Sequence, residues 1–186
     1  MAIISTIFPC SIWTISTLIM ITSAWTHNCS DPAVLAGAPC ANHKVYCKDN
    51  ETCSIFCNGV QECKSSIIYC TDGQSCQITC GHYESCDSMQ VYCPANGECI
   101  IDCSSEIEQA CEGINITAGS DGITNVDCRG EEACMSATID CKDSAQCNIH
   151  CYGLKACGDH PPFLPMTIYG QDTQNLSLSG CNGGTL

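Results

Sequence analysis

Cysteine is the residue type with the most chemistry to offer in this chain, because 22 of its 186 residues are cysteines. Thiols at this density persist as disulfides in an oxidising compartment, and such a share is typical of secreted chains held together by disulfides. A zinc site is disfavoured, since no two cysteines stand in a C-x2-C spacing. The cysteines therefore predict an extracellular, disulfide-rich protein that needs no metal ion and no other cofactor.

A second group that could do chemistry consists of Asp102, Asp127 and His150, with Asn125 and Asn148 beside them. Two neighbouring carboxylates could share a proton or hold a divalent cation, and a nearby histidine could act as an acid or a base. Some polysaccharide-cleaving enzymes carry such acidic clusters on a parallel β-helix. We favour a solvated polar face, which leaves cation binding and catalysis as the alternatives.

Three tyrosines, Tyr46, Tyr69 and Tyr92, recur at intervals of 23 residues. Tyrosines that stack on one exposed face could bind glycans or a protein partner. The simpler interpretation is a ladder of side chains that stabilises a sheet. We favour the ladder and keep the three tyrosines as candidate ligand-binding residues.

The Asp–His group and the tyrosines both follow from an internal repeat of about 23 residues. Cysteine recurs at four positions of this repeat, which we call the cysteine slots. The third copy is lengthened by two residues before its last cysteine, and the fourth copy has Ala118 and Thr124 in its first two slots. The slot cysteines are Cys47, Cys53, Cys57 and Cys63; Cys70, Cys76, Cys80 and Cys86; Cys93, Cys99, Cys103 and Cys111; Cys128 and Cys134; and Cys141, Cys147, Cys151 and Cys157.

Apolar residues keep the same register, since each copy has two positions that lie two residues from a cysteine slot. Residues two apart on a strand share a face, so each copy is two short inward-facing strands joined by polar turns. Such a unit buries its face by stacking on its neighbours, which predicts an all-β, right-handed parallel β-solenoid of about six coils. The two inward columns are Val45, Ile68, Val91, Ile116, Ile139 and Ile168, and Ile55, Ile78, Ile101, Val126, Ile149 and Leu178.

The slots also predict the pairing of the cysteines. Cys53 and Cys57 are about 13 Å apart on one strand and cannot bond. The first and second slots face each other across a narrow turn, as do the third and fourth, and the joint replacement by Ala118 and Thr124 fits loss of one bonded pair. Bonding between neighbouring coils is the alternative. Outside the slots, Cys29 and Cys40 would close an N-terminal cap, which leaves Cys181 free or intermolecular.

In this architecture the chain resembles the cysteine-stapled β-solenoids, whose familiar small members are the insect antifreeze proteins. The resemblance covers Cys40 to about Leu178 and rests on the C-x5-C-x3-C-x5-C spacing with a β-branched residue between. It implies an ice-binding face built from a regular Thr-x-Thr array, which the outward positions of the second strand do not repeat. Those positions are Ser54 and Phe56, Gln77 and Thr79, Ile100 and Asp102, Asn125 and Asp127, and Asn148 and His150.

The N-terminal segment indicates the compartment. Residues 1–24 carry no charged side chain and end in Thr22-Ser23-Ala24, which predicts a secretory signal peptide, with an uncleaved membrane anchor as the alternative. A cap and partial coil would follow at 25–46, the repeats at 47–169, and a last coil and tail at 170–186. Four Asn-x-Ser/Thr sequons predict glycosylation. Their asparagines are Asn28, Asn50, Asn115 and Asn175.

The charge balance excludes one class of partner, because 20 acidic and 6 basic residues give a net charge of −14 and cannot neutralise a nucleic acid. The function that we expect is a secreted structural or adhesive module of an extracellular coat, wall or matrix, and not an enzyme. A glycan-binding module and a carbohydrate-active enzyme are the alternatives. Expected partners are glycans, other coat proteins, or further copies of the chain joined through Cys181 and the solenoid ends. A membrane is expected only if residues 1–24 are retained.

Overall fold

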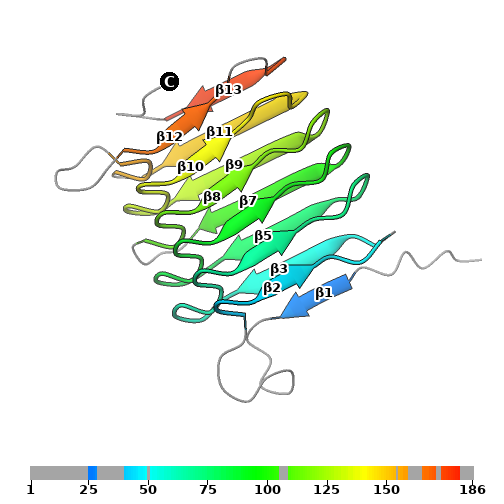
Figure 1. The fold of residues 1–186 in the computed structure, drawn as a ribbon. Helices are drawn as coiled ribbons and strands as arrows, with labels where there is room; N and C mark the ends of the chain where they lie inside the picture. Colours follow the sequence, from blue (N-terminus) through cyan, green and yellow to red (C-terminus); the bar gives the residue numbers. More distant parts are fainter. Residues whose placement is uncertain are drawn as a thin grey trace, which may run out of the picture.

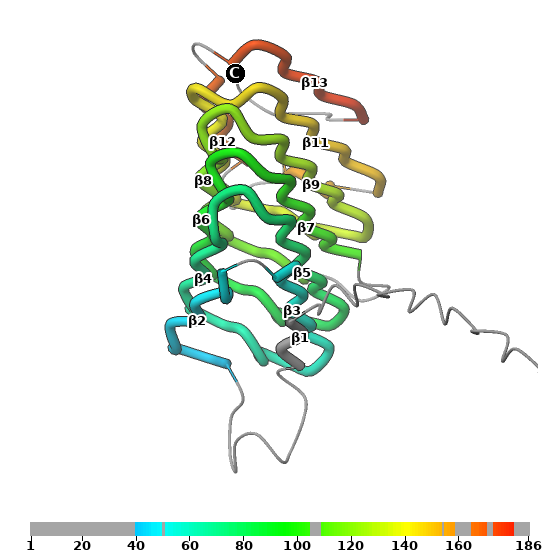
Figure 2. Tube along the Cα trace, turned by 90° about the vertical axis from the view of Figure 1, so that its right-hand side faces the viewer, coloured from blue at the N-terminus to red at the C-terminus, as the bar shows by residue number. Residues whose placement is uncertain are grey.

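In the part of the chain that the computed structural model describes, the regular elements are thirteen β-strands, arranged as a solenoid (Figure 1). The structure describes residues 25–28 by their backbone, and residues 40–49, 51–104, 109–153, 155–158, 165–170 and 173–180 in full. Strands alternate along the chain between two parallel sheets, which Figure 2 shows side by side. None of the described residues belongs to a helix long and apolar enough to cross a membrane.

The longer sheet has seven strands in the order β1-β3-β5-β7-β9-β11-β13, and the shorter has six in the order β12-β10-β8-β6-β4-β2. The strands of the longer sheet are β1 (Trp25–Asn28), β3 (Cys53–Cys57), β5 (Cys76–Cys80), β7 (Glu98–Ser104), β9 (Ile123–Arg129), β11 (Gln146–Tyr152) and β13 (Leu176–Ser179). The strands of the shorter sheet are β2 (Lys44–Tyr46), β4 (Ile67–Tyr69), β6 (Gln90–Tyr92), β8 (Asn115–Thr117), β10 (Thr138–Asp140) and β12 (Thr167–Tyr169). Six strands are separated by five intervals, so about five turns lie between β2 and β12.

The register between strands of neighbouring coils matches the 23-residue repeat of the sequence. Cys53 pairs with Cys76 and Ile55 with Ile78 in the longer sheet, while Val45 pairs with Ile68 in the shorter one. Like residues therefore stack on like residues, and the inward columns form one continuous core. The prediction of two buried apolar columns is confirmed, with Leu178 partly buried at the end of the second.

The long turn of each coil differs from the polar turn that was expected, because it buries a third set of side chains. The peptide groups of these turns also hydrogen-bond from coil to coil, as when Cys63 N donates to Ser85 O at 2.8 Å. Buried backbone needs such partners, so the turns stack like strands. Their inward side chains include those of Ser, Ala, Met and one Ile. The buried residues of these turns include Ser66, Ser85, Met89, Ala110, Ile114, Ala133, Met135, Ala137, Ala156 and Met166.

Among the described residues, nine disulfides with both partners in view close the two edges of the solenoid, with Cα–Cα distances from 5.6 to 6.1 Å. They are the pairs that the slot spacing predicts, and each links residues of one coil instead of bridging two coils. The pairs are Cys47–Cys53, Cys57–Cys63, Cys70–Cys76, Cys80–Cys86, Cys93–Cys99, Cys103–Cys111, Cys128–Cys134, Cys141–Cys147 and Cys151–Cys157. Cys40 is also disulfide-bonded.

Several sequence predictions lie outside the described residues: the signal peptide at 1–24, and the roles of Cys29, Cys181 and Asn50. The N-terminal cap is described in part. Its residues Trp25–Asn28 form β1, which extends the longer sheet by pairing in parallel with β3. The repeat spacing did not indicate this strand, because the segment that connects β1 to β2 is longer than the corresponding segment in any later coil.

Candidate functional site

The candidate site forms on the outer face of the longer sheet, where Asp102, Asp127 and His150 lie in one column. Asp102 pairs in register with Asp127, and Asp127 pairs with His150. Each of them stands between buried residues on its strand, so strand alternation turns its side chain outward. The structure therefore brings together the three residues that the sequence singled out, on β7, β9 and β11.

Asp127 is the centre of this column because both of its carboxylate oxygens have partners. Oδ1 lies 2.9 Å from His150 Nδ1, and Oδ2 accepts a hydrogen bond of 2.9 Å from Arg129. The Tyr152 ring lies 5.8 Å from the guanidinium carbon of Arg129 and 5.8 Å from the His150 ring, centroid to centroid. Both carboxylate oxygens of Asp127 are therefore engaged by side chains of the same face.

Arg129 and Tyr152 were not assigned to this site from the sequence, although a signal was present. Arg129 stands two residues after Asp127 on β9, and Tyr152 stands two residues after His150 on β11. Residues two apart on a strand face the same way. Extending the predicted strands by two residues, to Arg129 and Tyr152, would have placed both side chains on the polar face.

Asp102 differs from Asp127 in having an unsatisfied oxygen. Its Oδ1 is shielded from solvent and has no hydrogen-bond partner among the described residues. A proton shared with a neighbouring group, or a bound cation, is the chemistry that would satisfy such an oxygen. Asp102 and Asp127 are half-buried, and no group of three possible ligands forms around them among the described residues, so the geometry does not by itself assign a metal here.

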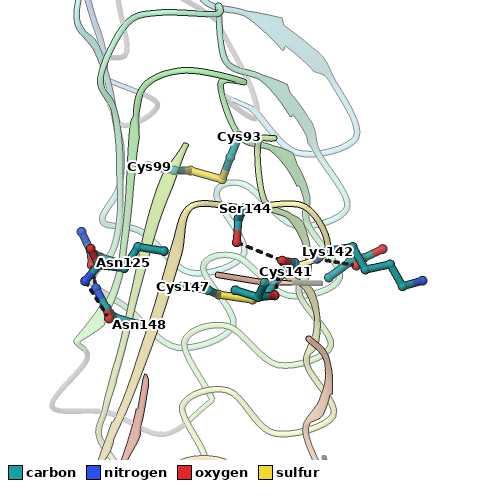
Figure 3. Close-up of a disulfide and its surroundings, with 11 residues drawn as sticks. Cys93, Cys99, Asn125, Cys141, Lys142, Ser144, Cys147 and Asn148 are labelled. Atoms are coloured by element: carbon teal, nitrogen blue, oxygen red, sulfur yellow. Dashed lines mark hydrogen bonds between the residues drawn. A yellow bond between two sulfur atoms is a disulfide. The ribbon is translucent and has the colours of Figure 1, made fainter. Parts of the chain in front are cut away.

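A ladder of amide side chains runs beside the Asp–His column. Gln146 donates to Asn148 at 3.2 Å, Asn148 donates to Asn125 at 2.7 Å, and Asn125 donates to Glu98 at 3.1 Å. Figure 3 shows the Asn148–Asn125 contact on the outside of the sheet, across from the disulfides. Each rung joins neighbouring side chains on the face, so the donors and acceptors of this ladder are bonded to one another and do not converge on an open centre.

The tyrosine column lies on the outer face of the shorter sheet. The rings of Tyr46 and Tyr69 are 4.8 Å apart and inclined by 7°, and those of Tyr69 and Tyr92 are 5.0 Å apart and inclined by 4°. Rings stacked in this way cover each other's faces and present their edges to water. Thr117, Asp140 and Tyr169 continue the column in register over β8, β10 and β12.

Charged side chains link the long turns of neighbouring coils, a feature that the sequence did not reveal. Lys64 Nζ lies 3.2 Å from Glu84 Oε2 and 2.6 Å from Asp87 Oδ2. The hydrogen bond with Asp87 raises the pKa of Lys64, and hydrogen bonds from Tyr83 and Gln61 lower the pKa of Glu84. Burial, followed by repulsion from Asp87, raises the pKa of Glu112 in the next coil.

Two groups of sulfur atoms approach closely enough to suggest metal ligation. Cys47, Cys70 and Cys76 form one group, and Cys80, Cys86 and Cys111 form the other, with sulfurs within 4.8 Å of one another. Every one of these sulfurs belongs to a disulfide. Metal ligation by cysteine needs the thiolate, so these clusters are stacked rungs of the ladder.

Comparisons with protein-family models, with curated proteins and with solved structures found no match to this chain. The fold and the placement of the candidate residues therefore rest on the chain's own repeat and geometry. The structure bears out the cysteine-stapled β-solenoid architecture expected from the spacing, without pointing to a particular family.

Proposed function

We propose that the protein is a secreted structural or adhesive module of an extracellular coat, wall or matrix. The observation that carries this proposal is the ladder of nine disulfides along the two edges of the solenoid. All but one of these bridges span a sequence separation of 6 residues, and the Cys103–Cys111 bridge spans 8. A chain stapled this often loses few residues when one turn is cut or opens, which suits long exposure to proteases outside a cell.

The two sheet faces support a structural role because their side chains bond to one another. On the longer sheet, Asp127 and the amide ladder are engaged with neighbours on the same face. On the shorter sheet, the tyrosine rings stack face to face. Both arrangements tie one coil to the next, which is the contribution expected of cross-strand ladders.

A glycan-binding module remains the first alternative, and a carbohydrate-active enzyme the second. Sugars bind aromatic side chains through the faces of the rings, and among the described residues this stack leaves only the outer faces of Tyr46 and Tyr92 uncovered. Asp127 is engaged by Arg129 and His150, and Asp102 is the one carboxylate of the column with an unsatisfied oxygen. We favour the structural role because most of the tyrosine ring faces and the Asp127 carboxylate are already occupied within the protein.

The test is to locate the native protein and to measure its resistance to proteolysis. We expect it in the insoluble extracellular fraction, resistant to trypsin until a reductant is added. Glycan-array binding that is lost when both end rings are removed, in Tyr46→Ala with Tyr92→Ala, and kept in Tyr69→Ala would support the binding module, because Tyr46 and Tyr92 end the stack. Polysaccharide cleavage lost in Asp127→Asn would support the enzyme. A soluble cytosolic protein with free thiols would contradict the proposal.

A further inference from the structure

One sequon asparagine lies in the middle of the shorter sheet. Asn115 begins β8, its side chain is exposed, and Thr117 of the same sequon faces the same way. Ile116 between them is buried, which fixes the outward direction of both side chains. Asn115 Nδ2 makes a long hydrogen bond of 3.5 Å to Gly113 O, and an N-linked asparagine keeps one N–H that can still donate it.

The tyrosine stack ends on the strand next to this asparagine. Tyr92 on β6 is covered on one ring face by Tyr69, and its other ring face looks along the sheet toward β8. The register position there is Thr117, which is too short to cover a ring, and Tyr92 is 39% exposed. Asn115 stands two residues before Thr117, so it is the diagonal neighbour of Tyr92, about 7 Å away.

Beyond Asn115 the outer face carries short side chains. The register positions over β10 and β12 are Thr138 and Thr167 in one column, and Asp140 in the other. The next aromatic ring is that of Tyr169 on β12. A branched, bulky group attached to Asn115 therefore has room over β8 and β10, with the ring of Tyr92 beside it.

We propose that Asn115 carries an N-linked glycan whose first sugar packs against the uncovered face of Tyr92. The C–H groups of a pyranose ring are apolar and match an aromatic face, while its hydroxyl groups stay in water. This proposal requires passage through a secretory pathway, as the proposed function does. The tyrosine column then has two roles: stacking of the three rings connects neighbouring coils, and the ring of Tyr92 orients the glycan.

The experiment uses the full chain secreted from a eukaryotic host. Peptide mass spectrometry measures the occupancy of Asn115, and guanidinium unfolding compares the glycosylated protein with Asn115→Gln. We expect the glycan to stabilise the protein, lowering the unfolding equilibrium constant roughly three- to tenfold, the size of one aromatic packing contact. Trimming the glycan to a single N-acetylglucosamine should leave this gain unchanged, because the first sugar makes the contact.

A double-mutant cycle isolates the contact from general effects of the glycan. In Tyr92→Ser the gain from the glycan should disappear. In Tyr46→Ser, which shortens the same stack three strands away from Asn115, the gain should persist.

Three outcomes would overturn the proposal. An unoccupied Asn115 in secreted protein, or an equal glycan effect in the Tyr92→Ser and wild-type proteins, would overturn it and leave the proposed function standing. Retention of the chain in the cytosol of the host would overturn both.

Discussion

The fourth coil of the solenoid lacks a disulfide that the coils on either side of it have, yet all three coils follow the same path. In the flanking coils, Cys93–Cys99 and Cys141–Cys147 link the first and second cysteine slots, at what we call the first edge of the solenoid, as Figure 3 shows. In the fourth turn, Thr124 occupies the register position between Cys99 and Cys147. The strands are unaffected, because β9 pairs with both β7 and β11 along seven residues. Stacking therefore maintains the path of the chain, and the disulfides add stability to it.

The replacement residues fill the missing rung incompletely. Ala118 and Thr124 are buried, and Thr124 Oγ1 has no hydrogen-bond partner among the described residues. A buried hydroxyl without a partner costs about 1–3 kcal/mol. The turn also packs closely on the one before it, since a Cβ at Gly119 would collide with the carbonyl oxygen of Pro94. The fourth turn thus keeps its position through close backbone packing and lacks the covalent restraint of its neighbours.

The largest change in stability is expected when the third coil is given the residues of the fourth. Cys93→Ala combined with Cys99→Thr removes the rung next to the weak turn, so two successive turns lack their first-edge bridge. We expect a loss of about 2–4 kcal/mol in the free energy of unfolding, because the unfolded chain regains the entropy of an open loop. Guanidinium unfolding without reductant measures it. No loss would mean that stacking alone determines stability.

The reverse change gives the fourth coil the bridge of its neighbours. Ala118→Cys with Thr124→Cys restores the missing rung at a sequence separation of 6, equal to that of the Cys141–Cys147 bridge. We expect a gain of about 2 kcal/mol, measured in the same way. Thr124→Val is the matched control, since it removes the unpaired hydroxyl without adding a bond and should gain about 1 kcal/mol. If the control gains as much as the double variant, the rung itself contributes nothing.

Hydrogen exchange compares the turns within the unmodified protein. Residues 118–127 keep their backbone hydrogen bonds, such as that of 2.8 Å from Ala118 N to Asp140 O, so they differ from residues 70–80 chiefly in the missing rung. We expect their slowest amides to exchange roughly tenfold faster, because an unstapled turn opens more easily. Equal protection in the two segments would assign local stability to stacking.

The smallest expected effect concerns the opposite edge, where five bridges follow one another and the turns carry charge. The pKa of Glu112 is raised above its ordinary value of 4.5 by burial and by the carboxylate of Asp87, so folding favours its neutral form. The stabilisation by neutral Glu112 is fully present below the pKa that Glu112 has in the unfolded chain. It is lost as the pH rises through the higher pKa that Glu112 has in the folded protein. Glu112→Gln should therefore stabilise the protein slightly at pH 7 and leave it unchanged at pH 3.

Glu84→Gln is the control for this pH experiment, because the pKa of Glu84 is lowered and the sign is reversed. Its stabilisation is present above the unfolded pKa and is lost as the pH falls. Glu84→Gln should therefore weaken the protein at pH 7, as measured by thermal unfolding over a pH series. Equal effects of the two substitutions at pH 7 would contradict the assignment of these charges.

The sequence predicted those parts of the fold that repeat. Slot cysteines and β-branched residues two positions away determine which side chains face inward, so the strands, the register and the bridges all followed from one period. The same parity placed Asp102, Asp127 and His150 in one column. What the period could not give is contact between long side chains, such as Arg129 with Asp127 or Lys64 with Asp87, because these depend on side-chain rotamers. Strand β1 was missed because its connection to β2 breaks the period.

The pairing of the cysteines decides whether the solenoid is stapled within its coils or between them, because the stacked register brings cysteines of neighbouring coils close together. Cys53 pairs in register with Cys76, so the ladder and the alternative of bonds between coils differ by one exchange of partners. The measurement is digestion without reductant, followed by mass spectrometry of the linked peptides. The account predicts the local links Cys57–Cys63 and Cys80–Cys86, together with Cys47–Cys53 and Cys70–Cys76. A peptide linking Cys53 to Cys76 would contradict it.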